Sequence, residues 1–592
     1  RRLAGAAAEV AVSLKAPDGR EVARRQVRVT IPPCGRGRFE TSFSVARPQL
    51  WEMVPGAALY RTEVSLAADG AADELSFRTG FRSFRFDAEK GFFLNGRHVQ
   101  LKGVCLHSDL GILGIAYNRS AMRRQLLAMR DMGANALRTS HNPPSPETLE
   151  LCDELGIFVW DECFDKWNET CGRGDEPLEE FVESALVDFV RRDRNHPCVF
   201  VWSIGNEIPA GGGFAPGQEV WNMPHTLGVT AERCARFRAA VRSEDVSRPV
   251  GMGCCFPKDS VRGGYGNLDI TGWNYNRNYM EMRRNFPDRP LLYSESASAF
   301  SDYGYYAPRL PTNKTDYAIA DLSVCSYDRN ASPWSDIPDR EFEYMERDAF
   351  VGGEFVWTGI DYLGEPSPYG TRVAGRNDMV LAPKDSARSA YFGIFDLLVF
   401  PKDRAFLYRS YWNREAFTLH IVPDHWTFPE RTGRTMPVYV YTSADEAELF
   451  VNGVSQGRRR KDPAATMEKG YYAGMPRYRL IWEDVPYAAG TVRAVAYGRD
   501  GSVLGEETLK TAGSAASVRL APESSVLPAD RNELVFVRVT LADADGTPVP
   551  PIRGNSRLRW QGWTERTSPS PPTAIPSKFI SDNFSIALAR RS

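Results

Sequence analysis

The feature that most constrains the fold is an alternation of strand-like and helix-like segments between residues 86 and 410. Short apolar runs, typical of buried strands, recur along this region, and helical patterns lie between most of them. Eight strands with mainly helical connections predict a (β/α)8 barrel, whose chemistry lies at the carboxyl ends of the strands. The runs are 100–107, 134–139, 157–162, 199–205, 249–255, 268–275, 290–295 and 353–358.

Two of the helical segments carry clear end signals. The stretch "SAMRRQLLAMRDMG" has apolar residues at helical spacing and ends at Gly133, and "SPETLELCDELG" has a proline near its start and ends at Gly156. Glycine is favoured just beyond a helix because it readily adopts the left-handed backbone conformation. Both stretches therefore predict helices that end at these glycines.

Alternating β patterns flank the predicted barrel. Asp18-Gly19 marks a hairpin in the first region, and Asn452-Gly453 marks one in the third. The fold class is therefore multidomain, with α/β and all-β parts around a central TIM barrel. The expected domains are an immunoglobulin-like β-sandwich cropped at its start (1–85), the barrel (86–412), a β-sandwich accessory domain (413–512), the start of a further immunoglobulin-like domain (513–552) and an irregular tail (553–592).

The amino-acid composition limits which classes of binding partner and cofactor are expected. Lys and Arg number 73 against 75 Asp and Glu, a formal net charge of −2, whereas nucleic acids and anionic membranes select a basic excess. No run approaches the roughly 20 apolar residues of a membrane span. The ten cysteines form no Cys-x-x-Cys pair, which favours buried free thiols over a zinc site. We expect no nucleic-acid partner, no metal and no cofactor.

Two carboxylates fall at the ends of predicted strands. Asn206-Glu207 ends the fourth strand and Glu295 ends the seventh. Two carboxyl groups on either side of a sugar can share the two catalytic roles of glycoside hydrolysis. One protonates the leaving oxygen, and the other attacks the anomeric carbon or activates water. A single rim glutamate is as often a structural ion pair, but the pair beside Asn206 is much more specific.

The surrounding motifs resemble glycoside hydrolase family 2, in its β-galactosidase branch. The resemblance covers roughly residues 10–510 and implies a retaining exo-β-glycosidase that acts on terminal β-D-galactosides through a covalent glycosyl-enzyme. The matching stretches are "GVCLHSDLG", "MGANALRTSHNPP", "CDELGIFVWDE", "WSIGNE", "LLYSES", "GGEFVWTGIDYLGEPSPYG" and "AYFGIFDLLVFPKD".

The resemblance also implies roles for single residues. Glu207 matches the acid/base and Glu295 the nucleophile of the family. The positions that resemble sugar-binding residues are His107, His141, Asn206, Tyr275 and Trp357, and those expected to support the glutamates are Arg138, Asp161 and Glu162.

Departures from the family pattern are informative. Lys166 and Asn168 stand where the best-known β-galactosidases carry a magnesium ligand pair, which argues against magnesium there. The segment "SARSAYFGIFDLLVFPKD" lacks the Asn-x-Lys pair of β-glucuronidases. No jelly-roll domain precedes the first predicted sandwich, which leaves a fragment that only binds glycan as one alternative. Another family 2 β-glycosidase, a glucuronidase or a marine-galactan hydrolase, is the other. Oligomeric state stays open, as do secreted, periplasmic and cytoplasmic locations.

Overall fold

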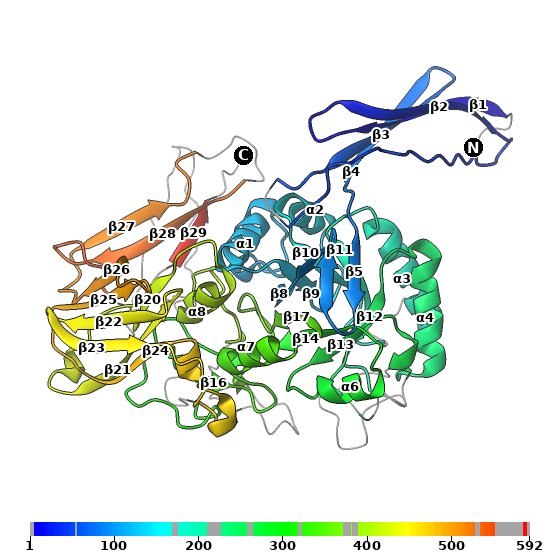
Figure 1. Cartoon of the computed structure of the whole chain (residues 1–592). Coiled ribbons are helices and arrows are strands. Elements are labelled where there is room, and N and C mark those ends of the chain that lie inside the picture. The colour runs from blue at the N-terminus through cyan, green and yellow to red at the C-terminus, as the bar shows by residue number, and fades with distance from the viewer. Residues whose placement is uncertain are drawn as a thin grey trace.

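The centre of the molecule is an eight-stranded parallel sheet that curls into a barrel (Figure 1). The computed structural model describes residues 5–53, 56–168, 176–209, 227–256, 258, 264–317, 323–370, 380–381, 389–526, 533–550 and 584–588. The strand order β12-β11-β10-β9-β8-β17-β14-β13 confirms the predicted fold class. The strands are β8 (Leu101–Leu106), β9 (Ala136–Thr139), β10 (Phe158–Glu162), β11 (Val199–Asn206), β12 (Val250–Gly253), β13 (Thr271–Asn274), β14 (Leu291–Ser296) and β17 (Val351–Val356).

The two ends of this strand order approach each other. The Asp269 N–H donates to Val250 O at 2.8 Å, and the Asn274 N–H donates to Cys254 O at 2.8 Å. These hydrogen bonds join the β12 and β13 regions and close the barrel. Closure brings the carboxyl ends of β11 and β14 to one rim, where barrel enzymes place their chemistry.

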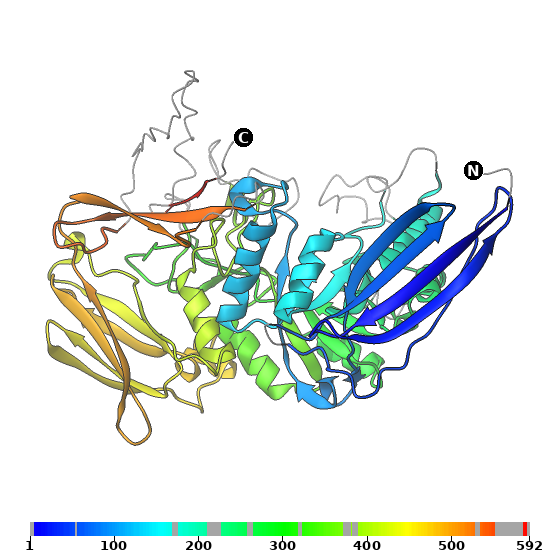
Figure 2. The ribbon, with the colours of Figure 1, turned by 90° about the horizontal axis from the view of Figure 1, so that it is seen from above.

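Helices lie outside the barrel (Figures 1 and 2). As the sequence predicts, α1 ends at Gly133 with φ of +108° and α2 ends at Gly156 with φ of +68°. The strands they cover are buried on both faces, as parallel barrel strands are, and every residue of β10 and β11 is buried. The helices are α1 (Arg119–Met132), α2 (Pro146–Leu155), α3 (Leu178–Asp193), α4 (Ala231–Glu244), α6 (Tyr279–Asn285), α7 (Pro338–Arg347) and α8 (Asp403–Trp412).

The N-terminal region forms one antiparallel sheet, in the order β2-β1-β3-β4, that projects from the barrel (Figure 1). The immunoglobulin-like sandwich predicted for 1–85 is thus a single four-stranded sheet within 5–53 and 56–79. Its outer strand stays exposed, and Leu75 is 62% accessible. The strands are β1 (Ala6–Lys15), β2 (Glu21–Ile31), β3 (Tyr60–Ala68) and β4 (Ala71–Thr79); a small sheet of β5 (Phe84–Asp87), β6 (Gly91–Leu94) and β7 (Arg97–Val99) leads into the barrel.

Two sheets follow the barrel, where the accessory sandwich was expected. The predicted hairpin at Asn452-Gly453 joins β22 to β23, with positive φ at both residues. One sheet contains β20 (Leu419–Val422), β21 (Thr435–Thr442) and β24 (Leu480–Pro486). The other contains β22 (Glu446–Val451), β23 (Val454–Arg460), β25 (Thr491–Tyr497) and β26 (Val503–Lys510).

A third sheet ends the described chain. It comprises β27 (Ser517–Pro522), β28 (Val535–Ala542) and β29 (Phe584–Leu588), so five residues of the expected irregular tail form a strand that pairs antiparallel with β28. The remainder of 551–592 lies outside the described residues. Two-residue pairs elsewhere are β15 (Ala299–Phe300) with β16 (Asn330–Ala331), and β18 (Tyr369–Gly370) with β19 (Val380–Leu381). Of the helices that the structure describes, none has the length and apolar character needed to cross a membrane.

Candidate active site

The predicted catalytic residues lie at the carboxyl ends of barrel strands. Glu207 directly follows β11, and Glu295 lies near the end of β14. Glu207 has φ of +46°, a left-handed conformation that residues other than glycine seldom adopt. Its N–H donates to Gly253 O at 2.9 Å, which ties it to the neighbouring strand. Backbone held in such a conformation by its surroundings is frequent at functional sites.

Glu295 is almost completely buried, with 2% of its surface accessible. One carboxylate oxygen, Oε1, accepts a hydrogen bond from Arg138 Nη1 at 2.7 Å, and the other, Oε2, accepts one from the Tyr275 hydroxyl. Burial raises the pKa of Glu295 above its ordinary value, whereas the charge of Arg138 and the Tyr275 hydrogen bond oppose that rise. Both of its oxygens are therefore held by donors that favour the ionised form.

Arg138 connects the two predicted catalytic strands. Its guanidinium is fully buried and also donates from Nη2 to Asn206 Oδ1 at 2.9 Å and from Nε to Glu162 Oε2 at 3.1 Å. Burial alone would raise the pKa of Glu162, but Arg138 and His141 hold it below its ordinary value. Arg138 therefore has a fixed position between two carboxylates.

Asn274 belongs to this cluster, and the sequence interpretation did not single it out. Its Nδ2 donates to Asn206 Oδ1 and to Glu207 Oε1, both at 3.0 Å, and its Oδ1 accepts a hydrogen bond from Ser294 Oγ at 2.6 Å. Asn274 ends β13 and directly precedes Tyr275. Its place at a strand end was the available signal, because barrel sites are built from such positions.

Aromatic rings form one wall of the site. The indole of Trp357 stacks on the His141 ring with centroids 5.2 Å apart and an interplanar angle of 13°, and His107 meets Trp357 edge to face at 5.3 Å. Tyr362, a further residue not predicted, packs 4.2 Å from His107. The predicted sugar-binding residues that follow β8, β9 and β17 are thus brought together: His107, His141 and Trp357.

The pKa values of the two histidines are shifted in opposite directions. Burial would lower the pKa of His141, but the contact of its Nδ1 with Glu162 Oε1 at 2.6 Å outweighs burial, so its pKa is raised. Burial lowers the pKa of His107 to about 3, and its buried Nε2 has no hydrogen-bond partner among the residues that the structure describes. Near neutral pH, His107 is a neutral imidazole with a ring nitrogen available to a ligand.

Asp161 does not join the cluster. Successive residues of a strand point to opposite faces, so Glu162 reaches Arg138 while Asp161 faces Asp193 and Arg192 of α3. Burial and the nearby Asp193 carboxylate raise the pKa of Asp161 well above its ordinary value. This placement corrects the prediction that Asp161 orients the glutamates.

An ion pair between a buried ammonium and a partly exposed carboxylate lies beside the acid/base strand. The Lys166 ammonium, 7% accessible, is 2.6 Å from Asp165 Oδ1, which also accepts from Asn206 Nδ2 at 3.2 Å. The contact with Lys166 lowers the pKa of Asp165 to about 2, although burial opposes this. Where the family pattern suggested metal ligands, this chain places its own cation.

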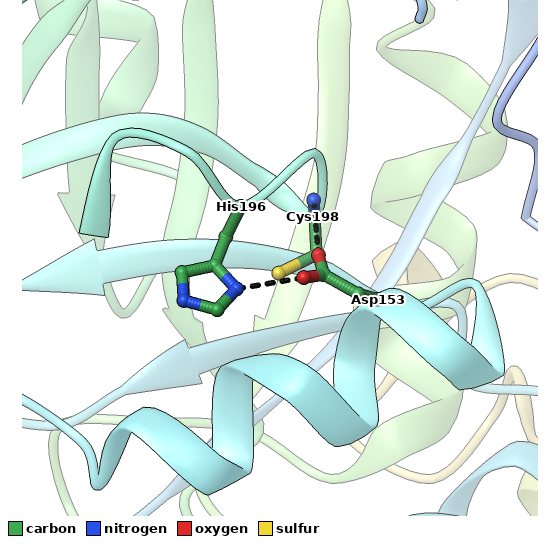
Figure 3. Close-up of side chains that lie close together, drawn as sticks. All are labelled: Asp153, His196 and Cys198. Carbon is green, nitrogen blue, oxygen red and sulfur yellow. Dashed lines mark hydrogen bonds and ion pairs between the residues drawn. The ribbon is translucent and has the colours of Figure 1, made fainter. Parts of the chain in front are cut away.

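One group in the described part of the chain has the composition of a metal site: Asp153, His196 and Cys198 (Figure 3). Asp153 Oδ2 lies 2.6 Å from His196 Nδ1, and Asp153 Oδ1 accepts the Cys198 N–H at 2.9 Å. The Cys198 thiol donates to Leu149 O at 3.5 Å, and burial raises its pKa well above the ordinary value. Because a cysteine binds metal as thiolate, we interpret the group as a structural tie between α2 and the start of β11.

Comparison with known proteins agrees with this geometry. Residues 87–256 match the TIM barrel domain of the glycosyl hydrolases family 2, and residues 433–505 match a domain of unknown function, DUF4982.

Relatives of known name match most of the chain. A β-galactosidase of Bacteroides ovatus is 37% identical over 574 residues, 91% of this chain and 63% of the relative. A putative β-glucuronidase of Formosa agariphila is 30% identical over 504 residues, 79% of this chain and 43% of the relative. The solved β-glycosidase from Bacteroides vulgatus aligns with a TM-score of 0.71 at 28% identity, covering 92% of this chain and 66% of that one. The chain thus spans less than two thirds of each of these proteins.

Proposed function

The chain belongs to glycosyl hydrolase family 2, and from that premise we propose that it is a retaining exo-β-galactosidase with Glu295 as nucleophile and Glu207 as acid/base. The observation that carries the proposal is the network around Arg138. Arg138 contacts Glu295 at 2.7 Å and Asn206 at 2.9 Å, and Asn274 connects Asn206 to Glu207. Two carboxyl groups with different surroundings therefore share one network at the barrel rim.

The proposed reaction is a double displacement. Glu295 attacks the anomeric carbon, the glycosidic C–O bond breaks, and its electron pair stays on the leaving oxygen, which takes a proton from Glu207. In the second step Glu207 removes a proton from water, whose oxygen replaces Glu295 at the anomeric carbon. Arg138 and Tyr275 favour the anionic nucleophile that both steps need.

The remaining site residues fit the recognition of a neutral sugar. Trp357 offers an apolar ring to one sugar face, and His107, with its unpartnered Nε2, offers a neutral nitrogen to a hydroxyl. Asn206, His141 and Tyr275 complete the proposed hydrogen-bonding set. Asn206 would contact the hydroxyl at carbon 2, where hydrogen bonds strengthen in the transition state.

A β-glucuronidase is the second candidate, because the Formosa agariphila relative carries that name. A glucuronate carboxylate calls for a cationic partner. Within the described part of the chain, the two buried cations identified at the site are already in contact with carboxylates, Arg138 with Glu162 and Glu295, and Lys166 with Asp165. This charge balance favours the galactoside.

The deciding experiment compares nitrophenyl β-galactoside with nitrophenyl β-glucuronide as substrates of the wild-type chain. We expect hydrolysis of the galactoside, retention of configuration in the first-formed sugar by NMR, and no turnover in Glu295→Gln. Preferred glucuronide hydrolysis would assign the second candidate. Full activity in a pure Glu295→Gln preparation would overturn the catalytic assignment, and binding of galactosides without hydrolysis would favour a glycan-binding chain.

A further inference from the structure

The orientation of the Asn274 amide follows from its neighbours. Arg138 has only donors, so the Asn206 atom that it contacts at 2.9 Å must be the oxygen, Oδ1. The Asn274 atom 3.0 Å from that same oxygen must then be a donor, Nδ2. The other end of the amide is Oδ1, which accepts the Ser294 hydroxyl at 2.6 Å.

This orientation determines which oxygen of Glu207 carries a proton. Asn274 Nδ2 lies 3.0 Å from Glu207 Oε1, and an N–H donor requires a lone pair there. Oε1 is therefore an acceptor in both protonation states of Glu207. A hydroxyl oxygen accepts a hydrogen bond less well than a carbonyl oxygen, so this donor favours the proton on Oε2.

The amide itself is held rigidly. Asn274 is 1% accessible, its backbone N–H donates to Cys254 O at 2.8 Å, and each of its side-chain polar atoms has a partner. A buried side chain with satisfied hydrogen bonds has little freedom to turn. Asn274 can therefore impose a direction on the half-buried Glu207.

We propose that Asn274 is a positioning residue for general acid catalysis: it occupies Glu207 Oε1, so that the transferable proton resides on Oε2. The proposal rests on the proposed glycosidase function. In the first step the Oε2 proton passes to the leaving oxygen as the glycosidic bond breaks, and Oε1 keeps its hydrogen bond to Asn274. Without the amide, the proton distributes over both oxygens and the carboxyl group can rotate.

The test is a leaving-group series. We would measure kcat/KM of wild type and Asn274→Ala on dinitrophenyl, nitrophenyl and methyl β-galactosides, because good leaving groups need little acid help. We expect a loss of about 100-fold for the methyl galactoside and less than about 3-fold for the dinitrophenyl galactoside. Ser294→Ala, which frees the far end of the amide, should show a weaker version of the same selectivity.

Asn135→Ala is the matched control. Asn135 donates to Gln100 O and accepts from the Lys102 N–H at the opposite end of the barrel, so its substitution should reduce thermal stability without leaving-group selectivity. An equal fall across all three substrates in Asn274→Ala would overturn the proposal and leave the glycosidase assignment intact. A wild-type chain that cleaves none of them would overturn both.

Discussion

The two carboxyl groups of the site are held in contrasting ways. Glu295 is buried, and its oxygens face a guanidinium and a phenol, whereas Glu207 is half-buried and receives a neutral amide. A guanidinium favours the anion strongly, and an amide N–H does so only weakly.

This difference shows how one barrel rim can support two roles. A nucleophile must remain ionised although its burial raises its pKa, so it needs a positive charge in contact. An acid/base must gain and lose a proton in each cycle, so it needs access to substrate and water and a partner that tolerates both states. The surroundings therefore match the roles proposed for Glu295 and Glu207.

Removing the Arg138 guanidinium should have the largest effect on the difference between the surroundings of Glu295 and Glu207. Arg138→Met leaves Glu162 and Glu295 buried without their cation, which should cost about 3–5 kcal/mol of unfolding free energy and abolish detectable turnover. Thermal melting and kcat/KM on nitrophenyl galactoside check this. Arg479→Met is the control, because Arg479 is equally buried and paired with Asp339 away from the rim. Arg479→Met should destabilise the chain while the folded fraction stays active. Turnover by Arg138→Met near the wild-type rate would contradict the role proposed for the Arg138 charge.

Steric crowding of the hydrogen-bond network around Arg138 should have the next largest effect on stability and activity. A Cβ at Gly253 would lie 2.7 Å from Asn206 Oδ1 and 2.8 Å from Arg138 Nη2. Gly253→Ala should cost about 1–3 kcal/mol and reduce kcat/KM at least about 10-fold, because the two carboxyl groups lose their common support.

Gly251 provides the matched control on the same strand. A Cβ there meets Ile270 Cγ2 at 2.7 Å, an apolar contact two residues from Gly253. Gly251→Ala should lower the melting temperature comparably and leave kcat/KM of the folded protein nearly unchanged. Equal losses of activity in the two variants would show that crowding of the barrel, not of the Arg138 network, is responsible.

The sequence predicted the strands better than the contacts between side chains. The periodicity of apolar residues and the residues that mark element ends located all eight barrel strands. The resemblance of motifs located Arg138, Glu162, Glu207 and Glu295. Alternation along β10 places Asp161 and Glu162 on opposite faces, although both are expected from the sequence to support the glutamates. Asn274 was missed because its partners come from β11 and β14, and its role depends on barrel closure, which no local pattern encodes. The pairing of β28 with β29 is likewise a long-range contact that composition does not indicate.

A smaller change, the loss of the Tyr275 hydroxyl, tests how the surroundings of Glu295 favour its ionised form. Tyr275→Phe removes one donor from Glu295 Oε2 while the Arg138 contact remains. The pKa of Glu295, already raised by burial, should rise further. Because the anion is the active form, activity is lost as pH falls through this pKa, so the acidic limb of the kcat/KM profile should move to higher pH. We expect about a 10-fold loss near neutral pH; an unmoved acidic limb would contradict the assigned hydrogen bond.

A carboxyl group outside the site, Asp424, tests the effect of a low-polarity environment on a carboxyl pKa. Asp424 lies between barrel and sandwich, where it accepts from the Tyr306 hydroxyl at 2.8 Å and is near Asp403, His420 and Glu507. Burial first, and then the Asp403 charge, raise its pKa to about 7. A raised folded-state pKa gives stability that is complete below the unfolded value and is lost as pH rises through the folded value.

The wild-type chain should therefore lose stability relative to Asp424→Asn, which stays neutral, between about pH 4 and pH 7. We expect a relative change of about 4 kcal/mol, because the pKa differs by about three units between the folded and unfolded states, read from urea unfolding midpoints at several pH values. Asp500→Asn is the control: Asp500 is exposed and its hydrogen bonds to Ser502 lower its pKa, so no such loss with rising pH should appear. Parallel curves for wild type and Asp424→Asn would mean that burial does not raise this pKa, and would weaken the same explanation for Glu295.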